Sequence, residues 1–191
     1  MAKKILILSG SPIKDGNTAA LVGWFTEGAR AQGADVEVVQ TAFLKYKANG
    51  CTSCRACQTR PAYECVIDDE ASPVLAKMAK VDVIVMATPL YFFGPSAQLK
   101  LMFDRMFSLY KWDNKANTMN TPLKGKTFVL LGSAYEDIGL AALRKPFALT
   151  AEYSGMKFVS LVVANAGESG EIRQKRPDIR KKAIALGKRQ A

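Results

Sequence analysis

Strand-like and helix-like segments alternate along this chain of 191 residues. Strand-like runs are short, apolar and rich in β-branched residues, whereas helix-like runs repeat their apolar residues every three or four positions. The expected strands are 4–8, 35–40, 81–87, 126–131 and 157–163, and the expected helices are 18–32, 71–79, 96–110, 140–153 and 177–188. Such alternation gives parallel strands joined by right-handed crossovers, with helices on both faces of one sheet. The sequence therefore predicts a doubly wound α/β fold with five parallel strands, in a single domain covering 1–191.

The segment after the first strand is rich in groups that bind an anion. Ser9-Gly10-Ser11-Pro12 precedes Gly16-Asn17-Thr18 at an expected helix start. Hydroxyls, a side-chain amide and free backbone N–H groups gather there, and the helix N-terminus adds partial positive charge. A phosphate cradle is the prediction, and an ordinary capped turn is the alternative. The lysine of a Walker A loop and the pattern G-x-G-x-x-G are both missing, so neither ATP nor tightly bound NAD is favoured.

Three consecutive aromatic residues follow the third strand. Tyr91, Phe92 and Phe93 lie between Pro89 and Gly94, and from an irregular loop they cannot all point into one core. These side chains would pack against a flat ligand such as an isoalloxazine ring, or against a second subunit at a dimer interface. After the fourth strand, small residues at 132–134 leave room for the same ring. Loops after parallel strands meet at one edge of the sheet, so these loops should form one site.

All the cysteines lie close together in a stretch, 41–70, that has no sustained period and is long for a connecting loop. Cys51, Cys54, Cys57 and Cys65 have the spacing C-x2-C-x2-C-x7-C. The first three match the bacterial ferredoxin run that ligates a [4Fe–4S] cluster, whereas the last gap is longer and Val66 stands where that run has proline. Zinc held by four thiolates and a set of free thiols stay open as alternatives.

Composition excludes several other classes of protein. The chain has no histidine, which excludes serine–histidine and cysteine–histidine hydrolases. Its formal charge of +10 favours anionic partners, and much of it lies near the C-terminus, between residues 173 and 189, as a solvated face or a docking surface. No nucleic-acid motif is present. No apolar run approaches the length of a membrane helix and no secretory signal is evident, so a cytoplasmic protein without a membrane span is expected.

Three groups of residues together resemble the NADPH-dependent FMN reductase superfamily, and within it the iron–sulfur flavoproteins. They are Gly10-Ser11-Pro12 with Gly16-Asn17-Thr18, Pro89-Leu90-Tyr91 with Gly94, and Leu99-Lys100 with Phe103-Asp104-Arg105. The resemblance covers 4–165. It implies a flavodoxin-like sheet in the order 2-1-3-4-5, one non-covalent FMN per subunit, and a homodimer or homotetramer.

The resemblance also implies roles for single residues. The FMN phosphate would be held by Ser9, Ser11, Asn17 and Thr18, with added charge from Lys14. The ring and ribityl chain would be lined by Pro89, Leu90, Tyr91, Phe92, Phe93 and Gly94, and closed on the far side by Ser133 and Ala134. Asp104 and Arg105 would form a structural or intersubunit ion pair. No catalytic side chain is expected, because the cofactor carries the chemistry.

The resulting hypothesis is an FMN-dependent oxidoreductase. With a cluster on the four cysteines, it would pass electrons between a ferredoxin-like acidic donor protein and a small acceptor such as a quinone, a flavin, oxygen or peroxide. Without a cluster, it would take hydride from NAD(P)H, a transient donor, and reduce a quinone, azo, nitro or flavin substrate. A non-catalytic flavodoxin-like redox sensor or binding module is the third possibility.

Overall fold

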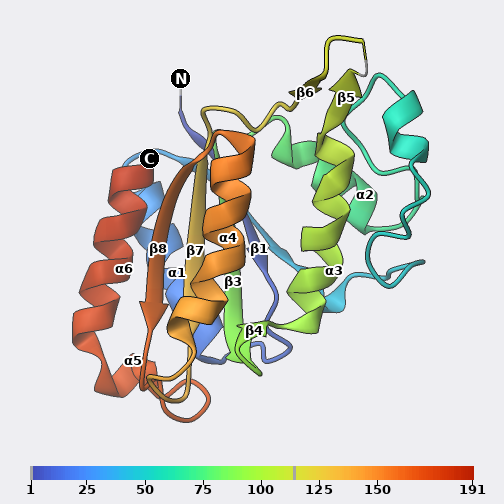
Figure 1. Ribbon diagram of the computed structural model, residues 1–191. Coiled ribbons are helices and arrows are strands. Elements are labelled where there is room, and N and C mark those ends of the chain that lie inside the picture. The colour runs from blue at the N-terminus through green and yellow to red at the C-terminus, as the bar shows by residue number, and fades with distance from the viewer. Residues whose placement is uncertain (1, 114) are drawn as a thin grey trace.

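A parallel sheet forms the centre of the molecule. The computed structural model describes residues 2–113 and 115–191, and Figure 1 shows its ribbon. The parallel strands are β1 (Lys4–Ser9), β2 (Asp35–Gln40), β3 (Val83–Tyr91), β7 (Thr127–Ser133) and β8 (Lys157–Val163). They pair in the order β2-β1-β3-β7-β8, which confirms the predicted order 2-1-3-4-5. The predicted α/β class with a doubly wound, flavodoxin-like sheet is likewise confirmed.

Helices cover both faces of the sheet, because its inner strands are apolar on both sides. The helices are α1 (Asn17–Arg30), α2 (Ala71–Met78), α3 (Ala97–Arg105), α4 (Leu140–Ser154), α5 (Ile172–Lys175) and α6 (Pro177–Gln190). Ile5 and Ile7 of β1 pack in one core with α1, α5 and α6, whereas Leu6 and Leu8 pack in a second core with α2, α3 and α4. Figure 1 shows the two layers, with α4 in front of the sheet and α1 behind it.

Helices α1 and α6 approach each other closely, because glycines lie where they cross. A Cβ atom added at Gly28 would collide with the Ile184 carbonyl oxygen, and one added at Gly187 would collide with the Phe25 carbonyl oxygen. Both glycines are buried. Helix α6 is therefore part of the core, and its basic residues occupy the outward face.

Strand β3 runs further than the sequence predicts. The predicted strand ends at Ala87 because Pro89 follows, yet Pro89 lies opposite Ser133 of β7 and the strand continues to Tyr91. The physical reason is that β1 pairs with β3 only as far as Ala87. Beyond that residue no strand on the β1 side needs a backbone donor, so a proline is tolerated there.

Several short elements lie outside the predicted pattern. They are β4 (Gly94–Pro95), which pairs with the end of β3, the hairpin of β5 (Lys111–Asp113) and β6 (Thr118–Asn120), and the 3-10 turns η1 (Thr41–Phe43), η2 (Ala56–Thr59) and η3 (Met106–Leu109). The helix predicted over 96–110 is thereby divided into α3 and η3. No helix in the part of the chain that the structure describes is long and apolar enough to cross a membrane.

The α1–α6 crossing yields a test of the fold. We expect Gly28→Ala to lower the free energy of unfolding by about 1–3 kcal/mol, because the added methyl group collides with backbone. Gly23→Ala is the matched control in the same helix, since Gly23 is exposed and a Cβ there meets nothing within 4 Å. That variant should gain about 0.5–1 kcal/mol from helix propensity. Urea unfolding measures both, and equal effects would contradict the close crossing.

Candidate functional site

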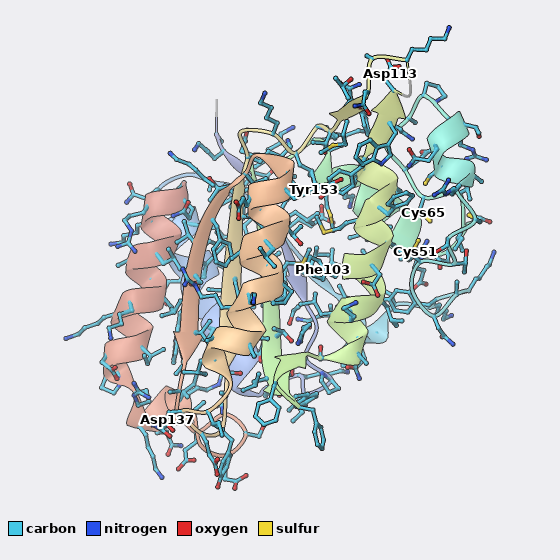
Figure 2. All side chains as sticks on the ribbon, in the orientation of Figure 1. Cys51, Cys65, Phe103, Asp113, Asp137 and Tyr153 are labelled. Atoms are coloured by element: carbon cyan, nitrogen blue, oxygen red, sulfur yellow. The ribbon has the colours of Figure 1, made fainter. Side chains whose placement is uncertain are left out.

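Loops from several strands meet at the carboxyl edge of the sheet, as parallel pairing requires. The loops after β1, β3, β7 and β8 line one cavity of about 260 Å³. Its walls include these residues named from the sequence: Ser11, Asn17, Thr18, Pro89, Leu90, Tyr91, Ser133 and Ala134. Asp137, labelled in Figure 2, marks the loop after β7 at this edge. The three loops expected to share a site are thus brought together.

The start of α1 forms the anion-binding end of this cavity. Gly16, the N-cap residue, has no side chain with which to cap the helix. The first N–H groups of a helix have no partner within it, and the residues that carry them, Asn17 and Thr18, line the cavity with Gly16. Ser11 holds the preceding turn, since its hydroxyl accepts from the Ile13 N–H at 3.2 Å. A phosphate suits this end, where backbone donors and the helix dipole act together.

Thr18 connects the start of α1 to the end of β7. Its Oγ1 lies 3.0 Å from Ser133 Oγ, and either hydroxyl can be the donor. Both side chains are buried, and both residues line the cavity. One hydrogen bond uses only one of the two hydroxyl protons, so the other proton can reach a ligand.

The side-chain amide of Asn17 makes its hydrogen bonds within the protein. Its Nδ2 donates to the carbonyl oxygens of Ala166 at 3.1 Å, Gly167 at 3.2 Å and Glu168 at 2.9 Å. Its Oδ1 accepts from the Ile172 N–H at 3.3 Å. The amide therefore ties the loop after β8 to the start of α1, and it contributes to the cavity by shaping its wall.

The loop after β8 is a part of the site that was not predicted from the sequence. Ala166, Gly167, Glu168 and Ser169 line the cavity, and the Tyr135 hydroxyl donates to Glu168 at 3.4 Å. The available signal was the run of small residues and glycines after the fifth strand, at the sheet edge where the other loops meet.

The aromatic residues after β3 form a tight turn. Phe92 and Phe93 have φ angles of 43° and 65°, and Tyr91 pairs with Gly94 across the turn. Left-handed backbone is costly for bulky residues and marks a turn that the surrounding structure enforces. Tyr91 lines the cavity, whereas Phe92 is 100% exposed. The turn geometry thus places Phe92, Phe93 and Gly94 outside the cavity wall.

Two other predicted phosphate ligands, Ser9 and Lys14, also do not line the first cavity. Ser9 is buried in β1, where its Oγ has no hydrogen-bond partner among the described residues. The Lys14 ammonium lies 5.3 Å from the centre of the Phe43 ring. Neither side chain lines the cavity, because Ser9 is the last residue of the strand and is buried, and Lys14 is exposed.

The four cysteines line a second cavity. Cys51, Cys54, Cys57 and Cys65 surround about 20 Å³, and Figure 2 shows Cys51 and Cys65 on the loop beside α3. The backbone N–H of Ala56, helped by other hydrogen bonds, lowers the pKa of Cys54. Among residues 2–113 and 115–191, no three histidine, cysteine, aspartate or glutamate side chains converge tightly enough to hold a metal ion.

Side chains anchor the cysteine loop to the body of the molecule. Gln58 Nε2 donates to the Tyr110 carbonyl oxygen at 2.8 Å and lies 3.5 Å from Cys57 Sγ. The Lys111 ammonium donates to the Cys57 carbonyl oxygen. A loop with little regular structure is therefore fixed at its most buried cysteine.

A buried ion pair supports the other side of the cysteine cavity. Arg105 Nη1 and Nη2 donate to Asp69 at 2.7 and 3.0 Å, and both side chains are almost completely buried. Burial alone would raise the pKa of Asp69, yet the hydrogen bonds from Arg105 and the loop backbone hold it below its ordinary value. The ion pair expected at 104–105 does not form between these two residues: Arg105 pairs with Asp69, and Asp104 pairs with Lys100.

Two buried donors at the cysteine cavity lack acceptors. Arg105 Nε and Ser108 Oγ have no hydrogen-bond partner in the described residues, and both residues line this cavity. Buried polar groups are rarely left unpaired. Their position beside four thiols indicates that the cavity suits an occupant rich in hydrogen-bond acceptors.

Helix α3 runs from the loop after β1 to the cysteine cavity. Ser96 caps its start by accepting from the Leu99 N–H at 3.3 Å, and its hydroxyl donates to the Gly10 carbonyl oxygen at 2.6 Å, in the loop after β1. Arg105 ends the helix at the cysteine cavity. A rise of about 1.5 Å per residue separates these two points by about 14 Å along the axis.

A larger cavity, about 700 Å³, lies between α3 and α4. It is lined by aromatic and aliphatic side chains such as Phe103, Trp112 and Tyr153, and Figure 2 labels Phe103 and Tyr153 there. It contains neither a helix start nor the cysteines. The residues that the sequence associates with a cofactor line the two smaller cavities instead.

In sequence the chain is similar to proteins of a known family. Residues 3–169 match the model of the family described as NADPH-dependent FMN reductase. An iron–sulfur flavoprotein of Methanocaldococcus jannaschii is 35% identical over 102 residues, which are 53% of this chain and 51% of that protein. One from Methanosarcina thermophila is 36% identical over 103 residues, again 53% and 51%. The chain spans about half the length of the curated relatives it matches.

Solved structures are similar along the whole chain. An FMN-dependent NADH-azoreductase from Bacillus anthracis, in complex with FMN, has a TM-score of 0.73 at 12% identity and covers 98% of this chain and 99% of its own. An NAD(P)H:quinone oxidoreductase from Methanothermobacter marburgensis has a TM-score of 0.66 at 15% identity, with 99% and 97% covered. At such identities the likeness shows the fold alone.

The Asn17 network yields a test of the first cavity. We expect Asn17→Asp to lower the free energy of unfolding by about 1–3 kcal/mol, because a carboxylate oxygen would replace the donor that faces three carbonyl oxygens. Asn120→Asp makes the same change at an exposed strand position and should have little effect. Thermal unfolding without added cofactor measures both. Equal stability of the two variants would show that the network does not hold the loop.

Proposed function

This chain belongs to the NADPH-dependent FMN reductase family, and we propose that it is a flavin-dependent oxidoreductase that binds FMN at the carboxyl edge of its sheet. The cavity there carries the proposal, because an uncapped helix start, a pair of hydroxyls and a tyrosine ring converge on it. FMN, when bound, supplies hydride and electron transfer.

The chain's own residues bind and orient the cofactor. The start of α1, with Ser11 and Thr18, holds the phosphate, since these groups donate hydrogen bonds where the helix dipole favours negative charge. Segment 89–91 lies against the ring, and Ser133 and Ala134 lie across the cavity from it. Asn17 keeps the loop after β8 closed on this site.

We further propose that the cysteine cavity holds a [4Fe–4S] cluster, which exchanges single electrons with the flavin site. Four thiols on one cavity match the donor set of such a cluster, and the unpaired donors of Arg105 and Ser108 suit its sulfur atoms. A cluster takes each thiolate on a different iron, so it needs no tight group of three ligands around one point.

Electron donors and acceptors follow from the surface. NAD(P)H or a ferredoxin-like acidic protein would supply electrons, the latter attracted by the charge of +10. Small acceptors such as a quinone, a flavin, oxygen or peroxide would reach the cavity through the exposed side of Tyr91. The apolar groove between α3 and α4 suits a homodimer or homotetramer, because it leaves Trp112 and Tyr153 exposed.

A cluster-free reductase is the second candidate. One observation favours it: the family that matches residues 3–169 is described by NADPH-dependent FMN reduction alone. Such a protein would transfer hydride from NAD(P)H to a quinone, azo or nitro compound through FMN alone.

Binding of FMN tests the first proposal. We expect Thr18→Val to weaken FMN binding about tenfold or more, since it removes a donor to a charged phosphate at a buried site. Thr26→Val is the matched control: it makes the same change in the same helix, at a buried hydroxyl that has no partner among the described residues. Quenching of flavin fluorescence measures both dissociation constants. Equal affinity of Thr18→Val and wild type would overturn the phosphate assignment.

Iron uptake tests the second proposal. We expect anaerobic incubation with iron and sulfide to give the wild type one cluster per chain, seen as broad absorbance in the blue. Each single Cys→Ser variant should lose the cluster and keep FMN, because the two cavities share no lining residue. No iron uptake by the wild type would instead establish the cluster-free reductase.

A further inference from the structure

Arg105 presents an unused donor to the cysteines. Its two terminal nitrogens are committed to Asp69, to the Ser72 hydroxyl at 3.0 Å and to the Ile67 carbonyl oxygen at 3.3 Å. Its third nitrogen, Nε, has no acceptor among the described residues. Arg105 lines the cysteine cavity, whereas Asp69 does not. The positive end of the buried ion pair therefore faces the thiols.

Ser108 repeats this arrangement one helical turn further along the chain. Its side chain is buried, its Oγ also has no partner in the described part of the chain, and it lines the same cavity. Two buried donors at one small cavity, from different residues, thus lack acceptors among the described residues. Whatever fills the cavity must accept hydrogen bonds.

Arg105 and Cys65 line the same cavity, and the Ser72 hydroxyl that accepts from Arg105 Nη2 links them. The same network fixes the Cys65 backbone, since the Ser72 hydroxyl donates to the Cys65 carbonyl oxygen at 3.2 Å. Arg105 thus lines the cavity beside a cysteine whose backbone is held by one of its own partners.

We propose that Arg105 and Ser108 are positioning residues that donate hydrogen bonds to the sulfur atoms of the cluster site and raise the reduction potential of the cluster. This inference rests on the proposed [4Fe–4S] cluster. Taking up one electron adds one negative charge to a buried centre, and a nearby cation and two donors favour that form. Removing them should make reduction harder.

Redox titration of the reconstituted protein tests this inference. Dithionite gives one electron to each cluster at controlled potentials, and electron paramagnetic resonance counts the reduced clusters. We expect Ser108→Ala to keep its iron and to lower the equilibrium constant for reduction about tenfold, or about 59 mV for a one-electron couple. Thr26→Val, which removes an unpaired buried hydroxyl away from the cysteines, should leave the potential unchanged.

The double variant R105Q/D69N removes both charges together, so that neither is left buried alone. We expect it to lower the potential further than Ser108→Ala does. If it fails to fold, Ser108→Ala decides the question, because that change removes only a hydroxyl. A loaded cluster whose potential is the same in wild type and Ser108→Ala would overturn the inference and leave the cluster in place. Absence of iron uptake by the wild type would overturn the cluster and this inference together.

Discussion

The inner strands β1, β3 and β7 are covered on both faces, so their peptide groups cannot bond to water and must bond to one another. Parallel pairing satisfies them and makes every strand end at one edge of the sheet. Because α1 follows β1 directly, its free N–H groups face that edge. The hydroxyls of Thr18 and Ser133 meet there for the same reason, although they are far apart in the sequence. The cavity is a consequence of the topology.

This explains why part of the site could be predicted from the sequence. Ser11, Thr18 and Ser133 directly follow predicted strands or begin a predicted helix, so the topology alone brings them together. Asn17 is different, because its amide partners lie about 150 residues away and no local pattern reveals them. Phe92 and Phe93 adopt backbone conformations that bulky residues disfavour, so their preferences argued against the tight turn they form.

The cysteine loop shows the same division between local and distant signals. The spacing of Cys51, Cys54, Cys57 and Cys65 predicted that they share a site, and all four line one cavity. What supports that cavity was hidden from the sequence, because Arg105 and Asp69 come from separate elements. A buried guanidinium requires a carboxylate partner, but only the folded chain identifies which one. The loop therefore depends on an ion pair that could not be predicted from the sequence of the loop.

Helix α3 fixes the distance between the loop after β1 and the cysteine cavity. A helix tolerates changes in composition better than changes in length. One inserted residue would lengthen it by about 1.5 Å and rotate its far end by about 100°. With Ser96 fixed on Gly10, Arg105 would turn away from Asp69 and from the cysteines. In the described residues of the β5–β6 hairpin, the hydrogen bonds reach only the cysteine loop, from Lys111 and Trp112. In homologous chains that keep both cavities, insertions and deletions should therefore fall in such hairpins and loops, while α3 keeps its register.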